Sequence, residues 1–145
     1  FDKLCALWVM HDHLSLRPGA PPAPDREIEA SLWFHFAPEI AVRLDRTNNA
    51  IRAGEEAGKG LLILPLGEFA LKASLEEGWY APSYGIREPA PVARFSGPVK
   101  LPIDFILLLQ PRQGEVDYKA SRAEGRAALV RMRKALSTST SSPSQ

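Results

Sequence analysis

The sequence predicts an all-β fold, a two-layer antiparallel β-sandwich, on three observations. Apolar and polar residues alternate from Glu27 to Phe36, the period of a strand with one face on a core. Further short apolar or alternating runs follow, joined by turn residues, at a spacing that favours a sandwich over βαβ units. The 13 prolines among 145 residues disfavour a helical bundle, because proline interrupts helices.

The expected elements follow the chain in order. Leu4–Met10 is apolar on both pleat faces and predicts a strand buried on both sides, and the proline-rich stretch Arg17–Asp25 predicts a loop. The alternation of the strand at Glu27–Phe36 ends at Pro38. Turns are expected at Thr47–Asn49 and Gly54–Gly58. Further strands are expected where Ile40, Val42 and Leu44 alternate with polar residues, at Ala50–Ala53 (short), at Leu61–Leu66 (in the core), at Phe69–Leu75 (buried on one side) and at Ile103–Leu109, which Pro111 closes. The segment Glu77–Pro102 is expected to be irregular and to hold one strand at Val92–Phe95.

The pattern changes near the C-terminus. Leu129, Met132 and Leu136 fall at helical spacing in an alanine-rich stretch, so we expect a short helix within Ser121–Leu136, with a strand through Ala127–Met132 as the alternative. The domain organisation is therefore a sandwich over 1–118, a basic and helical segment over 119–136, and a disordered Ser/Thr-rich tail over 137–145.

Composition excludes several functions. A net charge of +1 disfavours a nucleic-acid partner, and no apolar run is long enough for a membrane helix. The single cysteine, Cys5, excludes an internal disulfide and a cysteine-rich zinc site. No nucleophile elbow, P-loop or dinucleotide fingerprint is present. No signal peptide is visible, and because the chain starts at Phe1 rather than Met, we expect it to be a piece of a longer protein.

Two histidine motifs could carry chemistry. In a strand, His11 and His13 would share a face and could bind a metal, but a bare pair is a weak signal and a polar strand end is the favoured interpretation. His35 shares the non-core face of its strand with Trp33, so it could line an interface or a ligand surface, although a partly exposed histidine under a neighbouring loop is the favoured interpretation.

Aromatic and basic segments supply two further candidates. Gly78–Ile86 contains Trp79, Tyr80 and Tyr84 and predicts a rigid aromatic loop that binds carbohydrate, packs onto another domain, or covers one end of the sandwich. Lys119–Lys134 has six basic residues and one acidic residue, which favours a solvated helix face over a specific anion site.

Three stretches resemble the C-terminal part of the heparinase II/III-like family. The first is the strand that ends near Asp12, and the second is Leu32–Pro38, LWFHFAP. The third and most specific runs from Glu77 to Pro111, where EEGWYAPSYGIREPAPVARF precedes LPIDFILLLQP. The resemblance covers about Leu4 to Pro111 and departs from the family in the long loop Arg17–Asp25.

This resemblance implies a β-sandwich that belongs to a polysaccharide lyase, an enzyme that cleaves uronic-acid glycans by β-elimination. In the family, a helical toroid and an early sandwich histidine carry the catalytic groups, and both would lie upstream of Phe1. The resemblance therefore assigns no catalytic residue to this chain, which we expect to be inactive alone. It implies a partner toroid domain, an acidic polysaccharide as substrate, and a periplasmic or secreted location.

The resemblance also indicates residues for binding. His35 corresponds to a zinc ligand of some members, whose partner ligands would again be upstream, so zinc is expected in the parent protein and not in this chain alone. The substrate-binding candidates are Trp33, Trp79, Tyr80 and Tyr84. The alternative is a non-catalytic carbohydrate-binding module that stacks sugars on Trp33, Trp79 and Tyr80, or a purely structural interaction domain.

Overall fold

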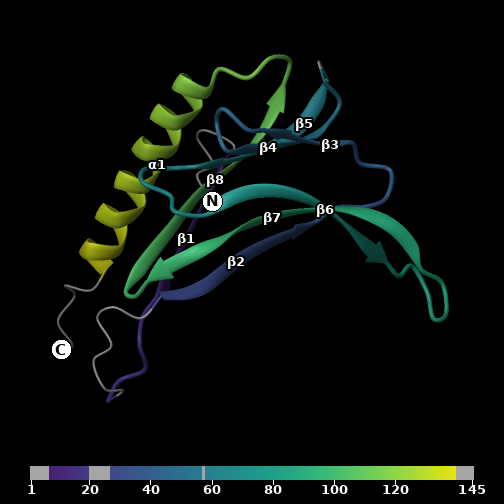
Figure 1. Cartoon of the computed structure of the whole chain (residues 1–145). Helices are drawn as coiled ribbons and strands as arrows, with labels where there is room; N and C mark the ends of the chain where they lie inside the picture. The colour runs from purple at the N-terminus through teal and green to yellow at the C-terminus, as the bar shows by residue number, and fades with distance from the viewer. Residues whose placement is uncertain (1–6, 20–26, 57, 140–145) are drawn as a thin grey trace.

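The computed structural model describes residues 7–19, 27–56 and 58–139, and shows the predicted β-sandwich with one C-terminal helix (Figure 1). Its elements are β1 (Trp8–Leu14), β2 (Glu27–His35), β3 (Val42–Asp45), β4 (Ala50–Gly54), β5 (Lys59–Pro65), β6 (Lys72–Tyr80), β7 (Glu88–Lys100), β8 (Ile103–Gln113) and α1 (Tyr118–Ser139). All strand pairs are antiparallel and form a five-stranded sheet, β1-β8-β5-β4-β3, and a three-stranded sheet, β2-β7-β6.

The main core lies between the two sheets. Phe95 on β7 and Phe105 on β8 are almost fully buried, and the ring of Phe69 contacts both edge-on, at 5.7 and 5.8 Å between ring centroids. The alternation of β2 places Ile28, Ala30, Leu32 and Phe34 on this core, as the sequence predicts. Apolar burial between the sheets is therefore the main stabilising contact of the sandwich.

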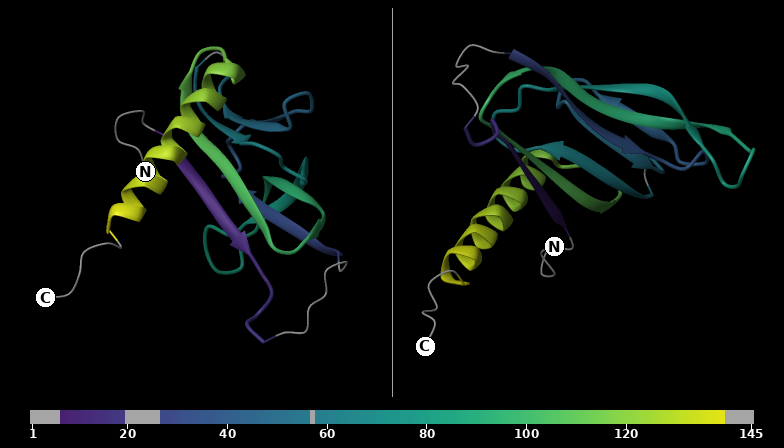
Figure 2. Two further views of the ribbon diagram at one scale, coloured as in Figure 1. Left: turned by 90° about the vertical axis from the view of Figure 1, so that its left-hand side faces the viewer. Right: turned by 90° about the horizontal axis from the view of Figure 1, so that it is seen from below.

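The helix α1 covers the other face of the five-stranded sheet. Ala128 is fully buried against leucines of β5 and β8, and a Cβ at Gly125 would lie 2.9 Å from the Leu66 side chain. Glycine thus allows close contact between helix and sheet. The C-terminal half of α1 extends past the sheet, where Val130 is 66% exposed (Figure 2).

Asn49 joins the two sheets at the β3–β4 turn. Its φ of 52° lies in the left-handed region that asparagine tolerates better than most residues. Its side-chain amide donates to the Leu71 carbonyl oxygen at 2.9 Å, and its carbonyl oxygen accepts from the Ala73 amide at 2.8 Å. The predicted turn therefore also fixes the start of β6.

The prediction of an irregular segment at Glu77–Pro102 is wrong. β6 continues to Tyr80 and β7 spans Glu88–Lys100. Pro89 and Pro91 pair with β6 beyond the last residue of β2, and Pro98 pairs with β2 before β6 begins. Pro89 and Pro98 therefore lie where β7 has a neighbouring strand on one side alone. Pro91 lies just beyond the last residue of β2, where its carbonyl oxygen accepts a hydrogen bond from the Phe36 amide at 3.1 Å, a role that does not need the N–H that proline lacks.

Several strand and helix limits also differ from expectation. β6 begins at Lys72 rather than Phe69, and α1 begins at Tyr118 rather than within Ser121–Leu136. β1 continues to Leu14, beyond the expected end at Met10. It is an edge strand rather than one buried on both sides, and Trp8 is 45% exposed; residues 4–6 lie outside the described part. β8 passes through Pro111, which pairs with β5 beyond the end of β1. α1 includes residues 137–139 of the expected tail, and residues 140–145 are not described.

Candidate functional site

The outer face of the three-stranded sheet carries an exposed tryptophan beside an arginine. Trp33 on β2 and Arg94 on β7 are direct register partners, so their side chains leave the sheet on the same side. The guanidinium carbon of Arg94 lies 4.7 Å from the Trp33 ring centroid, and Trp33 is 48% exposed. This geometry is that of a cation–π pair at a surface.

Arg94 is held in place from both neighbouring strands. Its Nε and Nη2 donate to the Ser31 hydroxyl oxygen at 3.2 and 3.1 Å, and its Nη1 donates to Glu76 Oε1 at 3.3 Å. The side chains of Arg94 and Glu76 are 28% and 38% exposed. The guanidinium is thus oriented before any ligand arrives, and it already donates a hydrogen bond to one carboxylate.

His35 lies next to Trp33 on the same face of β2. The two ring centroids are 6.5 Å apart, with an angle of 25° between the ring planes. Within residues 7–19, 27–56 and 58–139, no three His, Cys, Asp or Glu side chains are arranged to hold a metal ion. The assignment of His35 as a zinc ligand stays a prediction about a longer parent protein.

The other aromatic candidates lie elsewhere. Trp79 and Tyr80 are the last two residues of β6, and Tyr84 lies in the loop that leads to β7, at the tip of a hairpin that projects beyond the sandwich (Figure 1). Neighbouring strand residues point to opposite faces, so Trp79 and Tyr80 do not form one platform. Tyr80 pairs with Glu88, six residues along β7 from Arg94, or about 20 Å from the Trp33 face at the usual rise of a strand.

The hairpin tip has a tryptophan–arginine pair of its own. The guanidinium carbon of Arg87 lies 4.9 Å from the Trp79 ring centroid, and Trp79 is 57% exposed. The structure therefore divides the four predicted binding residues into the Trp33 face and the hairpin tip. The two tryptophan–arginine pairs provide a matched comparison for experiments.

His11 and His13 meet a carboxylate rather than each other. His11 Nε2 and His13 Nδ1 lie 2.8 and 3.0 Å from the same oxygen of Asp104, across the β1–β8 pair. Hydrogen bonds from these two rings hold the pKa of Asp104 below its usual range. The histidine motif thus ties the edge strand β1 to β8, as a polar strand end and not as a pair that faces a ligand.

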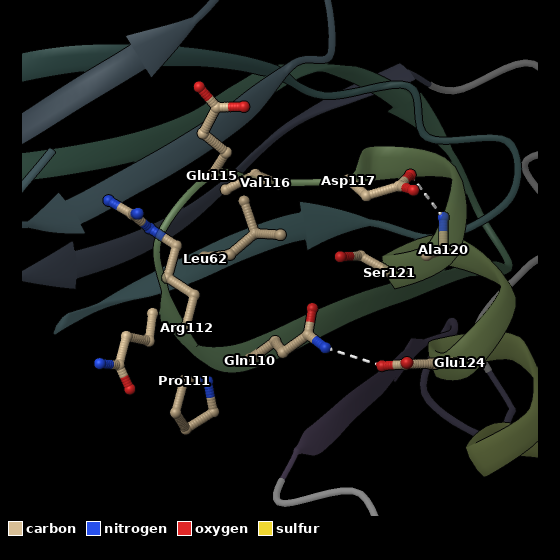
Figure 3. Close-up of a pocket in the computed structure, with 11 residues that line it drawn as sticks. Leu62, Gln110, Pro111, Arg112, Glu115, Val116, Asp117, Ala120, Ser121 and Glu124 are labelled. Carbon is tan, nitrogen blue, oxygen red and sulfur yellow. Dashed lines mark hydrogen bonds between the residues drawn. The ribbon is translucent and has the colours of Figure 1, made fainter. Parts of the chain in front are cut away.

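A hollow of about 240 Å³ lies where β8 leads into α1 (Figure 3). Asp117 begins the helix there, because its carboxylate accepts a hydrogen bond from the Ala120 amide at 2.9 Å. Across the hollow, the Gln110 amide donates to Glu124 at 2.8 Å. These contacts cap and dock the helix, so we assign no ligand to the hollow.

A second polar cluster surrounds the start of α1. Burial, and then the neighbouring Asp45 carboxylate, raise the pKa of Tyr118 to about 12. Burial works to raise the pKa of Asp45 too, but interactions with Tyr118 and Asn48 outweigh it and lower that pKa. Asn48 donates to both Asp45 oxygens and accepts from Arg122, which joins the helix to the β3–β4 turn.

Tyr118→Phe should change the stability of the protein at high pH. The unfolded phenol ionises near 10, whereas the folded one keeps its proton to about 12, so the wild type loses stability as the pH rises from about 10 to about 12. The Tyr118→Phe variant has no phenol to ionise, so it should not lose this part of its stability. Urea unfolding at several pH values measures it, with tyrosinate absorbance as a second readout, and equal losses in both proteins would contradict the assignment.

Arg94, Glu76 and Ser31 belong to this site, although the sequence pattern did not mark them as candidates. Arg94 lies inside the predicted strand Val92–Phe95, directly before the apolar Phe95. Because neighbouring side chains of a strand point to opposite faces, this position indicates that Arg94 lies on the outer face. Its place beside Trp33 depends on the β2–β7 register, which the sequence pattern alone does not determine.

Comparison of the chain with protein-family models, curated proteins and solved structures found no match. The resemblance to the heparinase II/III-like family therefore stays a prediction from the residues quoted above. In the part of the chain that the structure describes, no helix is long and apolar enough to cross a membrane.

Proposed function

We propose that this chain is a non-catalytic β-sandwich domain of a longer heparinase II/III-like lyase and binds acidic polysaccharide on the outer face of its three-stranded sheet. The observation that carries the proposal is the exposed Trp33 ring with the Arg94 guanidinium held 4.7 Å from its centroid. In this proposal the catalytic groups belong to a toroid domain outside the chain, and the parent protein works in the periplasm or outside the cell.

The chemistry of a uronic-acid unit suits this face. The apolar side of a pyranose ring stacks on an indole, and a carboxylate at the edge of that ring would reach the adjacent guanidinium. Ser31 and Glu76 fix the direction of Arg94, so a ligand would lose little entropy in ordering it. A ligand carboxylate would compete with Glu76 for the same guanidinium.

Trp33→Ala should weaken binding of polyuronate oligosaccharides about tenfold, or ~1.4 kcal/mol, because stacking and the cation–π contact are both lost. The matched control is Trp79→Ala, which removes an exposed tryptophan with its own arginine at the hairpin tip. Calorimetric titration of both variants with alginate oligosaccharides measures the effect.

The outcomes separate the two candidate surfaces. Weaker oligosaccharide binding in Trp33→Ala alone supports the outer face of the three-stranded sheet as the binding surface. Loss in Trp79→Ala alone would instead support the second candidate function, a carbohydrate-binding hairpin tip, for which the Trp79–Arg87 pair is the specific observation. Wild-type protein that binds no acidic glycan would contradict both proposals and leave a structural domain.

The non-catalytic part of the proposal has its own test. The chain alone should produce no unsaturated uronate, the product of β-elimination, from alginate or heparan sulfate. Ultraviolet absorbance of that product measures the reaction, and product formation that depends on protein concentration would show that the chain holds a catalytic set.

A further inference from the structure

Three arginines come together on the outer face of the five-stranded sheet. Arg43 on β3 and Arg52 on β4 are direct register partners, and both lie on the face opposite the core residues Val42, Leu44 and Ile51. Arg112 on β8 reaches the same place across β5, where its register partner is Gly60. A Cβ at Gly60 would lie 3.3 Å from Arg112 Nη2, so the missing side chain leaves room for the guanidinium.

All three guanidinium groups converge on Glu56. Arg52 Nη2 and Arg112 Nη1 each donate to its main-chain oxygen at 3.2 Å. Arg43 Nη1 contacts its carboxylate oxygen Oε2 at 2.9 Å. Two charged groups that share one oxygen lie close together, and we call Arg43, Arg52 and Arg112 the arginine cluster.

The Glu56 carboxylate is bound to Arg43, whereas Arg52 and Arg112 donate to uncharged main-chain oxygens, Arg112 to those of Glu55 and Gly114 as well as that of Glu56. Like charges directly opposite each other on paired strands destabilise a sheet. Burial, followed by the charge of Arg52, lowers the pKa of Arg112. Among the residues that the structure describes, the Nε atoms of Arg52 and Arg112 are buried and have no hydrogen-bond acceptor. Such a cluster gains from an additional anion.

Glu56 shows where that anion would bind. Its carboxylate is bound to Arg43, but the Glu56 side chain as a whole is 72% exposed, so it has open space into which to turn. The two main-chain bonds from Arg52 and Arg112 do not depend on the carboxylate. An external anion could therefore replace the carboxylate while the guanidinium groups keep their positions.

We propose that the arginine cluster binds a sulfate or phosphate group in the place that the Glu56 carboxylate now takes against Arg43. A tetrahedral anion offers three or four acceptor oxygens, which suits three converging guanidinium groups better than the two oxygens of a carboxylate. The site lies on the opposite outer face of the sandwich from Trp33, so it is separate from the proposed polysaccharide face and does not depend on it.

Titration with inorganic sulfate and inorganic phosphate, at constant ionic strength set with chloride, tests the site. NMR signals of the arginine Nε–H groups report which side chains respond. In wild type, the signals of Arg52 and Arg112 should shift and saturate. Arg52→Gln should weaken binding of the anion at least tenfold, and Arg126→Gln, at an exposed position of α1, should leave the anion affinity unchanged. Wild-type signals that respond equally to chloride would overturn the proposal.

Glu56→Gln keeps the proposal testable if Arg52→Gln fails to fold. It retains the main-chain oxygen that Arg52 and Arg112 use and removes only the competing charge. The sulfate affinity should then rise several-fold, and an unchanged or lower affinity would contradict the role of Glu56 as the displaced group. A sulfated disaccharide and a sugar phosphate, titrated in parallel, distinguish the two sources of the anion. Trp33→Ala should leave unchanged the affinities for inorganic sulfate and inorganic phosphate that the Arg52 and Arg112 signals report, so failure of the polysaccharide face and failure of this site are distinguishable.

Discussion

Replacement of Phe95 by alanine should lower the free energy of unfolding by about 3–5 kcal/mol. Phe95 is fully buried on β7, and its ring contacts Phe34 and Phe69 edge-on at 6.1 and 5.7 Å. Phe69 in turn contacts Phe105 on the opposite sheet. Loss of the Phe95 ring would therefore leave a cavity at the junction of the two layers, in a domain whose total stability is of the order of 5–15 kcal/mol.

The size of this effect is checked by urea unfolding with tryptophan fluorescence. Phe95→Leu keeps much of the volume and should cost less than Phe95→Ala, while Leu75→Ala, at a 39% exposed site of the same sheet, should cost least. If Phe95→Ala cost no more than Leu75→Ala, the packing between the sheets would not be the main core.

The β2 strand shows how much the sequence could predict. Its strict alternation separates Leu32 and Phe34, which face the core, from Trp33 and His35, which do not. This assignment needs no knowledge of the neighbouring strands, because side chains on a strand alternate with a period of two. Fold class and the exposed aromatic face were therefore predictable.

The β7 strand shows where prediction from sequence fails. Prolines at 89, 91 and 98 indicate a loop when each is considered alone, yet every one of them lies past the end of one neighbouring strand of the sheet. That fact depends on where β2 and β6 begin and end, which is a property of the whole sheet. The local signal was strong and the tertiary arrangement overrode it.

The arginine cluster could not be predicted for a similar reason. Arg43 and Arg52 are close in sequence, but Arg112 joins them only through the order β8-β5-β4-β3 and the glycine at position 60. The alternation does place each arginine on an outer face. Which of them meet is decided by strand order and register, and composition carries no information about either.

The helix α1 supplies the other large expected effect. Ala128 is fully buried on the outer face of the five-stranded sheet, where it packs among Leu7, Leu62, Leu64 and Leu108. Ala128→Glu would place a carboxylate in this apolar contact. We expect a loss of about 3–5 kcal/mol, the usual result for a buried charge without a partner.

Ala127→Glu is the matched control, because it makes the same substitution one residue earlier, at an exposed position beside Arg126. Its stability should stay within about 0.5 kcal/mol of wild type. Urea unfolding compares the two variants, and hydrogen exchange of the α1 amides shows whether the helix leaves the sheet before the strands unfold.

Detachment of the helix would expose a continuous apolar surface on β1, β5 and β8, since Val9, Leu62, Leu64 and Leu108 form one buried cluster with Ala128 of the helix. Ala128→Glu should therefore bind a hydrophobic dye and self-associate more than Ala127→Glu does. If both variants unfolded at the same urea concentration and bound dye equally, the outer face would be stable without α1. The helix would then be an appendage of the sandwich, and the cluster that contains Tyr118 and Arg122 would have to hold its first turn without support from the apolar contact.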